Sequence, residues 1–525
     1  MPLARTRSVA LSGVQGRVVE VEADIGQGLP GTTLVGLPDA SVAESRDRCR
    51  AAVSNSGFDW PNRRLTVGLS PASLRKTGSH YDLAIALAVL AAYDVVPRER
   101  IEGVMVLGEL ALDGRLRAVP GVLPATLAAH RAGIDQVIVP EANASEAALV
   151  TGVAVLGARS LAQAAAVLRD EEPPEAPPVP PLADEGALSW RGDERLRGID
   201  LADVVGQVLA RRAVEVAAAG GHHLFLDGPP GAGKTMLAER LPGLMPDLDE
   251  AESLEVTAVH SVAGALPADV PLLTRPPFVD PHHTASTVSI VGGGSRVIRP
   301  GSISLAHRGV LFLDEAPEFR ADALEALRQP LESGEIVVGR AAAQSRFPAR
   351  IVLVLAANPC PCGRNYGKGL LCECTPAVQR RYRNRLSGPV RDRVDVTQVM
   401  HPLTPHQMRS ELQSVETSAT VAARVRVARE RQWERLSGLP WRRNGDIPGP
   451  ELRRRFPVAP RAMRVPYQLV QQGVLTARGA DRVVRISWTL ADLAGVDPPG
   501  SEQVDEALEL RTGVPLGVLL RRRAS

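Results

Sequence analysis

The segment Gly228-Pro229-Pro230-Gly231-Ala232-Gly233-Lys234-Thr235 has the residue types and spacing needed to hold the phosphates of a nucleotide. Its glycines allow successive backbone N–H groups to point inward at phosphate oxygens. Lys234 would add a positive charge near the β- and γ-phosphates, and the Thr235 hydroxyl can ligate Mg²⁺. The chain has only three lysines, at positions 76, 234 and 368. A lysine at this position is therefore unexpected in a plain glycine-rich turn, which is the alternative interpretation.

Two adjacent carboxylates follow four apolar residues in Gly309-Val-Leu-Phe-Leu-Asp314-Glu315. This pattern indicates a buried parallel strand with an acidic carboxyl end. We expect Asp314 to hold the Mg²⁺ shell through water, and Glu315 to orient and deprotonate the attacking water. An ordinary strand with a solvated acidic end is the alternative, and the phosphate-binding segment upstream argues against it.

A third apolar run, residues 350–357, ends at Asn358-Pro359. In ring-forming ATPases, a polar amide at the tip of the corresponding strand lies beside the γ-phosphate, where it senses phosphate and positions water. Asn358 is therefore the candidate for that role.

Four cysteines follow closely, as the pairs Cys360-Pro-Cys362 and Cys372-Glu-Cys374 separated by nine residues. Four thiols on one short loop can converge on a tetrahedral ion, for which zinc is the natural occupant and iron is conceivable. The C-x-C spacing is tighter than the usual C-x₂-C, so four reduced structural thiols are the alternative. A bound ion would brace the segment that follows Asn358. Cys49 stands alone and is expected in the core.

The length and composition limit the class of protein. A chain of 525 residues is expected to hold two to four domains. The 61 basic and 59 acidic residues nearly cancel, so any nucleic-acid surface must be local. We expect no membrane span, because no apolar run reaches 18 residues. The N-terminus lacks the apolar region of a signal peptide, and five cysteines make no disulfide framework, which favours the cytoplasm.

The pattern along the chain predicts an α/β multidomain protein. Residues 1–170 mix strands and helices in an α+β unit, and 171–196 form a proline-rich linker. Residues 197–400 carry the nucleotide motifs on strands that alternate with helices, as a parallel sheet requires. Residues 401–525 are mostly helical by period. In the first unit we expect strands at 17–23, 64–69 and 136–139, and helices at 82–92 and 123–132.

Arginine-bearing insertions are expected within the ATPase region, because 80 residues separate Lys234 from Asp314. Residues 284–301 resemble a β-hairpin with a glycine tip, and a second hairpin is expected between positions 332 and 351. Two solvated surface turns are the alternative. The candidates for contact with a phosphate backbone are Arg296, Arg299, Arg340 and Arg346.

Taken in order, these motifs resemble the magnesium-chelatase-like AAA+ ATPases of the YifB/ComM family. Further segments that carry the resemblance are Pro281-His-His-Thr-Ala-Ser, Glu325-Ala-Leu-Arg-Gln-Pro-Leu-Glu and Arg385-Leu-Ser-Gly-Pro-Val-Arg-Asp-Arg-Val-Asp395. The resemblance covers nearly the whole chain. It implies a hexameric ring that binds ATP between neighbouring subunits, with the insertions projecting toward a central pore. Members of the ComM kind are DNA motors that drive branch migration, and the rival function is the motor subunit of a metal chelatase.

The resemblance also assigns arginines to the ATP site. Arg393 is the candidate for an arginine finger that reaches a neighbour's γ-phosphate, with a salt bridge to Asp392 or Asp395 as the alternative. Arg478 is the candidate for a sensing arginine of a C-terminal helical lid. Its rivals at helical spacing are Arg482 and Arg485, and surface charge is the alternative for each.

The first unit resembles the Lon-protease and ribosomal-S5 type of domain. Lys76 falls in the segment that resembles the lysine of the protease dyad, but Ser79 lies too close in sequence to serve as its nucleophile. We therefore expect no protease activity and a role in assembly or nucleic-acid guidance. His282 and His283 are expected to hydrogen-bond near the first hairpin rather than to bind metal, because neighbours in an extended chain point to opposite sides.

Overall fold

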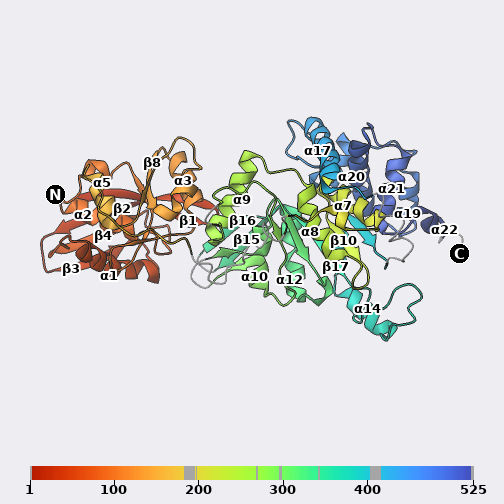
Figure 1. Ribbon diagram of the computed structural model, residues 1–525, viewed down its shortest axis with the longest axis horizontal. Helices are drawn as coiled ribbons and strands as arrows, with labels where there is room; N and C mark the ends of the chain where they lie inside the picture. Colours follow the sequence, from red (N-terminus) through yellow and green to blue (C-terminus); the bar gives the residue numbers. More distant parts are fainter. Residues whose placement is uncertain are drawn as a thin grey trace.

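The computed structural model describes residues 3–182, 196, 198–267, 270–294, 298–340, 343–402 and 415–521. The molecule is elongated, with the N-terminal unit at one end and the C-terminal helices at the other (Figure 1). A parallel sheet lies between them and carries the nucleotide motifs. The predicted α/β class is confirmed, as is the helical character of the C-terminal region.

The N-terminal unit is built on a mixed seven-stranded sheet. Its strands in spatial order are β3 (Gly31–Val35), β4 (Arg64–Ser70), β2 (Gln15–Gly26), β1 (Leu3–Ser12), β5 (Met105–Val106), β8 (Gln136–Pro140) and β9 (Ala154–Ala158). The helices are α1 (Ala40–Asn55), α2 (Asp82–Ala92), α3 (Val122–Arg131), α4 (Ala144–Ala147) and α5 (Leu161–Leu168). Every residue of α2 is buried, which suits an apolar helix at the centre of a core. The three strands and two helices expected in this unit are all present.

Lys76 is fully buried in this unit. Its Nζ donates to the carbonyl oxygens of Gly36 (2.9 Å), Leu69 (2.8 Å) and Pro71. The Ser79 hydroxyl donates instead to the carboxylate of Glu109. Lys76 therefore ties the backbone at Gly36 to the backbone at 69–71, and Ser79 is engaged elsewhere.

Replacing Lys76 with methionine should lower the free energy of unfolding by about 2–4 kcal/mol, because three buried carbonyls lose a charged donor. Urea unfolding of the full chain followed by circular dichroism measures the change. Lys368→Met, at an exposed lysine, is the control and should change little. Equal stability of the two variants would contradict the structural role of Lys76.

The ATPase region has a five-stranded sheet in which every pairing is parallel. Its strands in spatial order are β11 (Phe278–Val279), β14 (Val310–Leu313), β17 (Val352–Ala357), β10 (Leu224–Asp227) and β18 (Val396–Val399). Alternate residues of β17 enter two different hydrophobic cores, one on each face of the sheet. The carboxyl ends of β10, β14 and β17 consequently meet at one edge, which is where ligands bind in open α/β sheets.

Helices cover this sheet and continue into the C-terminal region. Beside the sheet lie α7 (Val208–Gly220) and α8 (Lys234–Leu244), followed along the chain by α12 (Ala321–Ala326), α13 (Arg328–Ser333), α14 (Pro376–Asn384) and α15 (Gly388–Arg393). The C-terminal helices are α17 (Ser418–Arg435), α18 (Gly449–Arg455), α19 (Arg464–Gln471), α20 (Ala477–Ala494), α21 (Ser501–Thr512) and α22 (Leu516–Arg521). These helices agree with the helical period expected over residues 401–525. Among the described residues, none of these helices combines the length and apolar character that crossing a bilayer requires.

The insertions form the elements between the sheet and the N-terminal unit: α9 (Glu250–Ala263), α10 (Thr287–Val291), β12 (Gly292–Gly293), β13 (Arg299–Pro300), α11 (Ser302–Leu305), β15 (Glu335–Arg340) and β16 (Ala343–Pro348). The hairpin expected between 332 and 351 is confirmed as β15–β16. The hairpin expected over 284–301 is wrong in its first half, which forms α10. The reason is local, because the Ser286 hydroxyl accepts from the Ser289 N–H and caps a helix there. Among the described residues of this range, Gly292–Gly293 and Arg299–Pro300 pair as strands.

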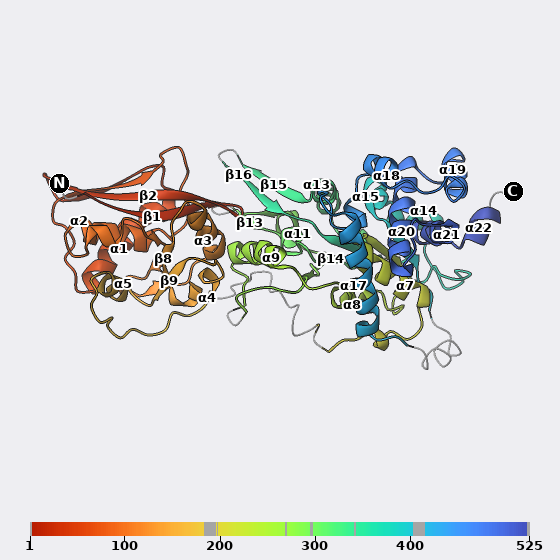
Figure 2. The same ribbon diagram turned by 90° about the horizontal axis from the view of Figure 1, so that it is seen from above.

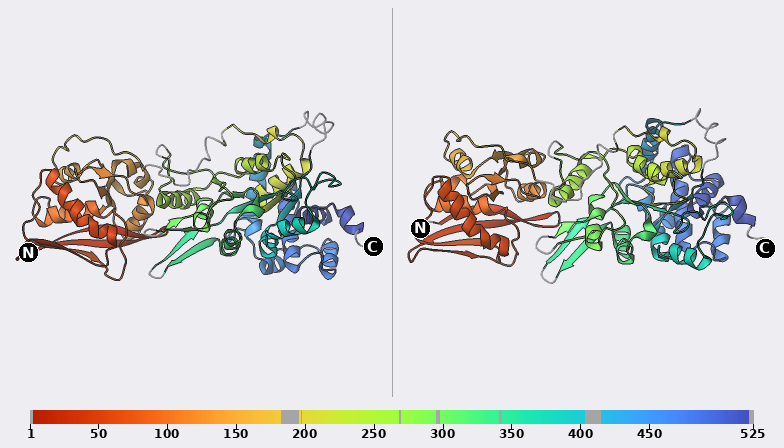
Figure 3. Two further views of the ribbon diagram at one scale, coloured as in Figure 1. Left: turned by 90° about the horizontal axis from the view of Figure 1, so that it is seen from below. Right: turned by 60° about the horizontal axis from the view of Figure 1, so that its bottom comes forward.

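The N-terminal unit rests on these insertions. Leu123 of α3 packs in one cluster with Ala258 of α9, and the Gly121 N–H donates to the Ser261 carbonyl at 3.0 Å. The Ser12 hydroxyl at the end of β1 donates to the Gln344 carbonyl of β16 at 3.1 Å. Figures 2 and 3 show α9 and the β15–β16 hairpin on the side of the ATPase region that faces the N-terminal unit. The N-terminal unit is therefore in direct contact with the insertions.

Three fully buried histidines make stability depend on pH. His222 bonds to the Thr489 hydroxyl (2.7 Å), His260 to the Leu305 carbonyl (3.0 Å) and His307 to Glu255 (3.3 Å). Burial lowers the pKa of each imidazole to about 4.

We expect the free energy of unfolding to fall as pH drops from about 7 to 5.5, with each histidine contributing about 1 kcal/mol over that window. The sign follows because the unfolded chain takes up protons near pH 6.5, while the folded state stays neutral to about pH 4. Urea unfolding at several pH values measures the slope, and His222→Gln should reduce it. A flat profile would contradict neutral buried imidazoles.

Candidate nucleotide-binding site

The phosphate-binding segment 228–235 connects β10 to α8, with Lys234 as the first residue of the helix. Gly231 and Gly233 have φ values of 76° and 90°, a left-handed conformation that glycine adopts without strain. The turn therefore places the N-terminus of α8 and its free N–H groups at the mouth of the loop, where they favour an anion.

Lys234 and Asn358 meet at this loop, from two neighbouring strands. The buried Lys234 Nζ donates to the carbonyls of Gly228 (2.6 Å) and Pro229 (3.0 Å) and to Asn358 Oδ1 (3.0 Å). Burial lowers the pKa of Lys234, and the carboxylates of Asp314 and Glu315 are among the groups that oppose the shift. The ammonium and the amide can thus both face the same terminal phosphate.

Thr235 and Asp314 are also brought together. The Thr235 hydroxyl donates to Asp314 Oδ2 at 2.8 Å, and the other oxygen of Asp314 accepts from the Glu315 N–H at 2.8 Å. A hydroxyl beside a carboxylate offers the hard oxygen ligands that Mg²⁺ prefers, next to a phosphate-binding loop. This donor set fits the expected Mg²⁺ site.

Glu315 follows β14 in an unusual conformation, with a φ of 50°. The left-handed region costs a non-glycine residue about 1 kcal/mol or more, and such strain is concentrated at functional sites. The conformation turns the half-exposed Glu315 carboxylate out of the sheet edge, where its Oε2 lies 3.4 Å from His283 Nδ1.

His283 is a residue of this site that the sequence interpretation missed. The expectation that His282 and His283 point apart is wrong, because their ring centroids are 4.2 Å apart and the chain turns from His283 onward. The signal for His283 was its position just after β11, the strand that pairs with β14.

His283→Ala should lower kcat for ATP hydrolysis by roughly three- to tenfold with little change in KM, because the carboxylate loses the group that orients it. The control is His282→Ala, whose imidazole bonds to the Thr284 hydroxyl at 2.8 Å. Steady-state kinetics over a range of pH would distinguish the variants. Equal rates for both would exclude a positioning role for His283.

Gln207 is a second residue that was missed. It precedes α7 with a φ of 54°, and its amide donates to the carbonyls of Ala232 (3.3 Å) and His401 (2.6 Å). It therefore links the phosphate-binding loop to the chain that follows β18. A polar residue between Gly206 and a helix was the only signal in the sequence.

The proposed finger, Arg393, is half-buried at the end of α15. It donates to the Pro389 carbonyl at 2.8 Å and pairs with Glu332. The alternative salt bridges to Asp392 and Asp395 are not the contacts that the structure gives it. The finger role therefore requires that Arg393 exchange Glu332 for a phosphate.

The three arginines of α20 differ in their surroundings. Arg478 is exposed, and its nearest recorded carboxylate, on Asp392, is 3.9 Å away. Arg482 pairs with the buried Asp395, and Arg485 donates to the Ile447 carbonyl at 2.7 Å. Arg478 is consequently the one of the three that is most available to a ligand.

The structure describes the side chains of two of the four hairpin arginines. Arg299 is exposed on β13, whereas Arg346 on β16 lies 3.2 Å from Glu335. Arg340 is the last residue of β15, and Arg296 lies outside the described residues.

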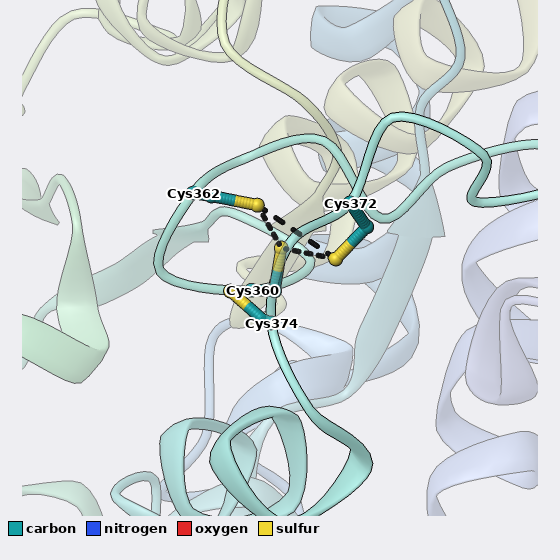
Figure 4. Close-up of side chains that lie close together, drawn as sticks. All are labelled: Cys360, Cys362, Cys372 and Cys374. Atoms are coloured by element: carbon teal, nitrogen blue, oxygen red, sulfur yellow. Dashed lines mark hydrogen bonds between the residues drawn. The ribbon is translucent and has the colours of Figure 1, made fainter.

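The four cysteines of residues 360–374 converge in one place (Figure 4). The Sγ atoms of Cys360 and Cys362 are 3.3 Å apart, and each lies 3.7 Å from that of Cys372. The Sγ of Cys374 joins them, so all four ligand atoms lie within 4.8 Å of one another. All are free thiols.

A P-loop, a hydroxyl–carboxylate pair, a glutamate and an amide at one edge of a parallel sheet define the class of P-loop ATPases. Three family models match the chain: "Magnesium chelatase, subunit ChlI" over residues 200–408, "Subunit ChlI of Mg-chelatase" over 21–143, and "Magnesium chelatase, subunit ChlI C-terminal" over 415–511. The chain belongs to the magnesium-chelatase-like YifB/ComM family of AAA+ proteins.

Relatives match along the full length. An uncharacterized protein of Mycobacterium tuberculosis is 52% identical over 97% of this chain and 99% of its own. YifB of Escherichia coli is 41% identical over 97% of each chain. The competence protein ComM of Haemophilus influenzae is 40% identical over 98% of this chain and 99% of its own. The 38 kDa magnesium-chelatase subunit of Rhodobacter capsulatus is 28% identical over only 25% of this chain.

Proposed function

We propose that this protein is an ATP-hydrolysing ring motor that remodels DNA, using ATP and Mg²⁺. The observation that carries the ATPase half is the contact of Lys234 with Asn358 beside that of Thr235 with Asp314. The ion, when bound, would neutralise phosphate charge. Glu315 would take a proton from water as its oxygen attacks the γ-phosphorus and ADP leaves. Lys234 and Asn358 would hold the γ-phosphate for that attack.

A hexamer completes the site in this proposal, with Arg393 acting on a neighbour's ATP and Arg478 sensing nucleotide within its own subunit. The exposure of Arg478 supports its part. The matched ranges support a division into an N-terminal domain (1–170), a linker (171–196), an ATPase core (197–400) and a helical lid (401–525). Five free cysteines and the use of ATP suit the cytoplasm.

The DNA half of the proposal is supported by the full-length match to a competence protein. The insertions offer Arg299 and Arg346 for phosphate contacts. A metal-chelatase motor is the weaker reading, because the 38 kDa chelatase subunits align with only 25% and 30% of this chain, whereas ComM aligns with 98% of it.

The test measures ATPase rate with single-stranded, duplex and four-way-junction DNA over a salt titration. We expect stimulation that declines as salt rises, because phosphate contacts release counterions. Arg299→Ala should weaken the stimulation, and Arg320→Ala, at an exposed arginine paired with Asp322 (3.1 Å), is the control. A rate that no DNA changes at low salt would overturn the DNA half.

A further inference from the structure

The spacing of the four thiols matches that of a tetrahedral zinc site. A Zn–S bond of about 2.3 Å places the sulfurs of such a site about 3.8 Å apart. The recorded distances among Cys360, Cys362 and Cys372 are 3.3, 3.7 and 3.7 Å, too long for disulfides. The amide of Gln379 on α14 donates to Cys372 Sγ (3.4 Å) and to the Cys374 carbonyl (3.1 Å), as an outer group that orients a ligand.

The segment that carries the thiols has little else to fix it. Within the described range 343–402, residues 358–375 form neither helix nor strand. Leu370 and Leu371 at its tip are exposed, and of the four cysteines in this segment only Cys360 is fully buried. An irregular segment of this length, with so few core contacts, needs a cross-link to hold one conformation, and a tetrathiolate ion supplies one.

The same segment contacts the candidate nucleotide site at two points. It begins at Asn358, whose side chain accepts from Lys234. Gly363, between the thiol pairs, packs on Pro230 of the phosphate-binding loop, so closely that a Cβ on Gly363 would lie 2.7 Å from the Pro230 ring.

We propose that Cys360, Cys362, Cys372 and Cys374 bind one Zn²⁺, and that the ion holds the cysteine segment against the phosphate-binding loop so that ATP binding depends on the metal. Neither the family descriptions nor the names of the relatives assign such a site. Zinc binding does not depend on the proposed ATPase function. The effect of the metal on ATP binding does depend on it.

The metal is tested on the full-length protein by elemental analysis after dialysis. We expect one zinc per chain, lost in Cys362→Ser and Cys374→Ser. Cys49→Ser is the control and should keep its zinc. Cys49 is buried in the N-terminal unit, where its thiol donates to the Asp82 carbonyl. Cobalt(II) exchanged into the wild-type protein should show the intense absorption of a tetrahedral thiolate site. Protein that binds neither metal would overturn the proposal even if it hydrolyses ATP.

The bracing effect is tested with metal kept in place. Gly363→Ala should retain zinc yet weaken binding of a fluorescent ATP analogue by roughly tenfold, because its Cβ pushes the segment off Pro230. Gly367→Ala is the matched control, since Gly367 also has a positive φ (58°) but open space around its Cβ position. Chelation of the wild-type protein should weaken the analogue similarly, and added Zn²⁺ should restore it. Unchanged binding in Gly363→Ala and after chelation would refute the bracing role. A zinc-loaded wild-type protein that binds the analogue but fails to hydrolyse ATP would refute the ATPase assignment instead.

Discussion

Glu315→Gln should leave ATP bound and stop its hydrolysis, with kcat lower by roughly 10²–10⁴-fold. The substitution keeps the shape of the side chain and removes only its ability to accept a proton. The neighbouring contact between Thr235 and Asp314 does not involve the Glu315 side chain, so Mg²⁺ and nucleotide binding should persist.

The measurement pairs phosphate release with equilibrium binding of a fluorescent ATP analogue. Glu318→Gln is the control on the same turn, because Glu318 pairs with Arg385 at 2.7 Å and should be dispensable for the chemistry. A Glu315→Gln protein that turns over normally would remove Glu315 from the mechanism. Loss of analogue binding would show instead that its carboxylate holds the nucleotide.

The sequence was sufficient to predict the groups that meet at the sheet edge. Asp314 and Asn358 directly follow apolar strands, and the helix that begins with Lys234 and Thr235 follows a third strand after a short loop. Parallel strands end at a common edge, so motifs far apart in sequence become neighbours without knowledge of the strand order. The hydrogen bonds from Lys234 to Asn358 (3.0 Å) and from Thr235 to Asp314 (2.8 Å) agree with that rule.

What the sequence could not predict depends on tertiary contacts or on a few local bonds. The pairing of His283 with Glu315 requires β11 to lie beside β14, and the left-handed φ of Glu315 has no sequence signal. The error over 284–301 arose because a serine cap starts a helix among the β-branched residues that precede the glycines. The partner of Arg393 was likewise missed, since Glu332 lies 61 residues away in the chain.

Arg393→Ala should lower ATPase activity by roughly 10²-fold or more if the guanidinium completes a neighbour's site. The pair with Glu332 offers a different explanation, in which Arg393 only fixes α15 against α13. Glu332→Gln separates the two. This substitution frees Arg393 without removing it. If Arg393 is an arginine finger, the Glu332→Gln protein should keep its ATPase activity. If the pair is only structural, its activity should fall as far as that of Arg393→Ala.

Mixed assemblies then test whether Arg393 acts between subunits. Glu315→Gln and Arg393→Ala are each expected to be inactive alone, because every interface of a ring lacks one of the two groups. Random mixing in equal amounts gives about a quarter of interfaces an intact glutamate on one side and an intact arginine on the other. Activity recovered toward that fraction requires the two residues to serve one site from different chains. If native mass spectrometry shows mixed rings but no activity is recovered, Arg393 acts within its own subunit. The pair with Glu332 would then explain why an arginine is present at this position.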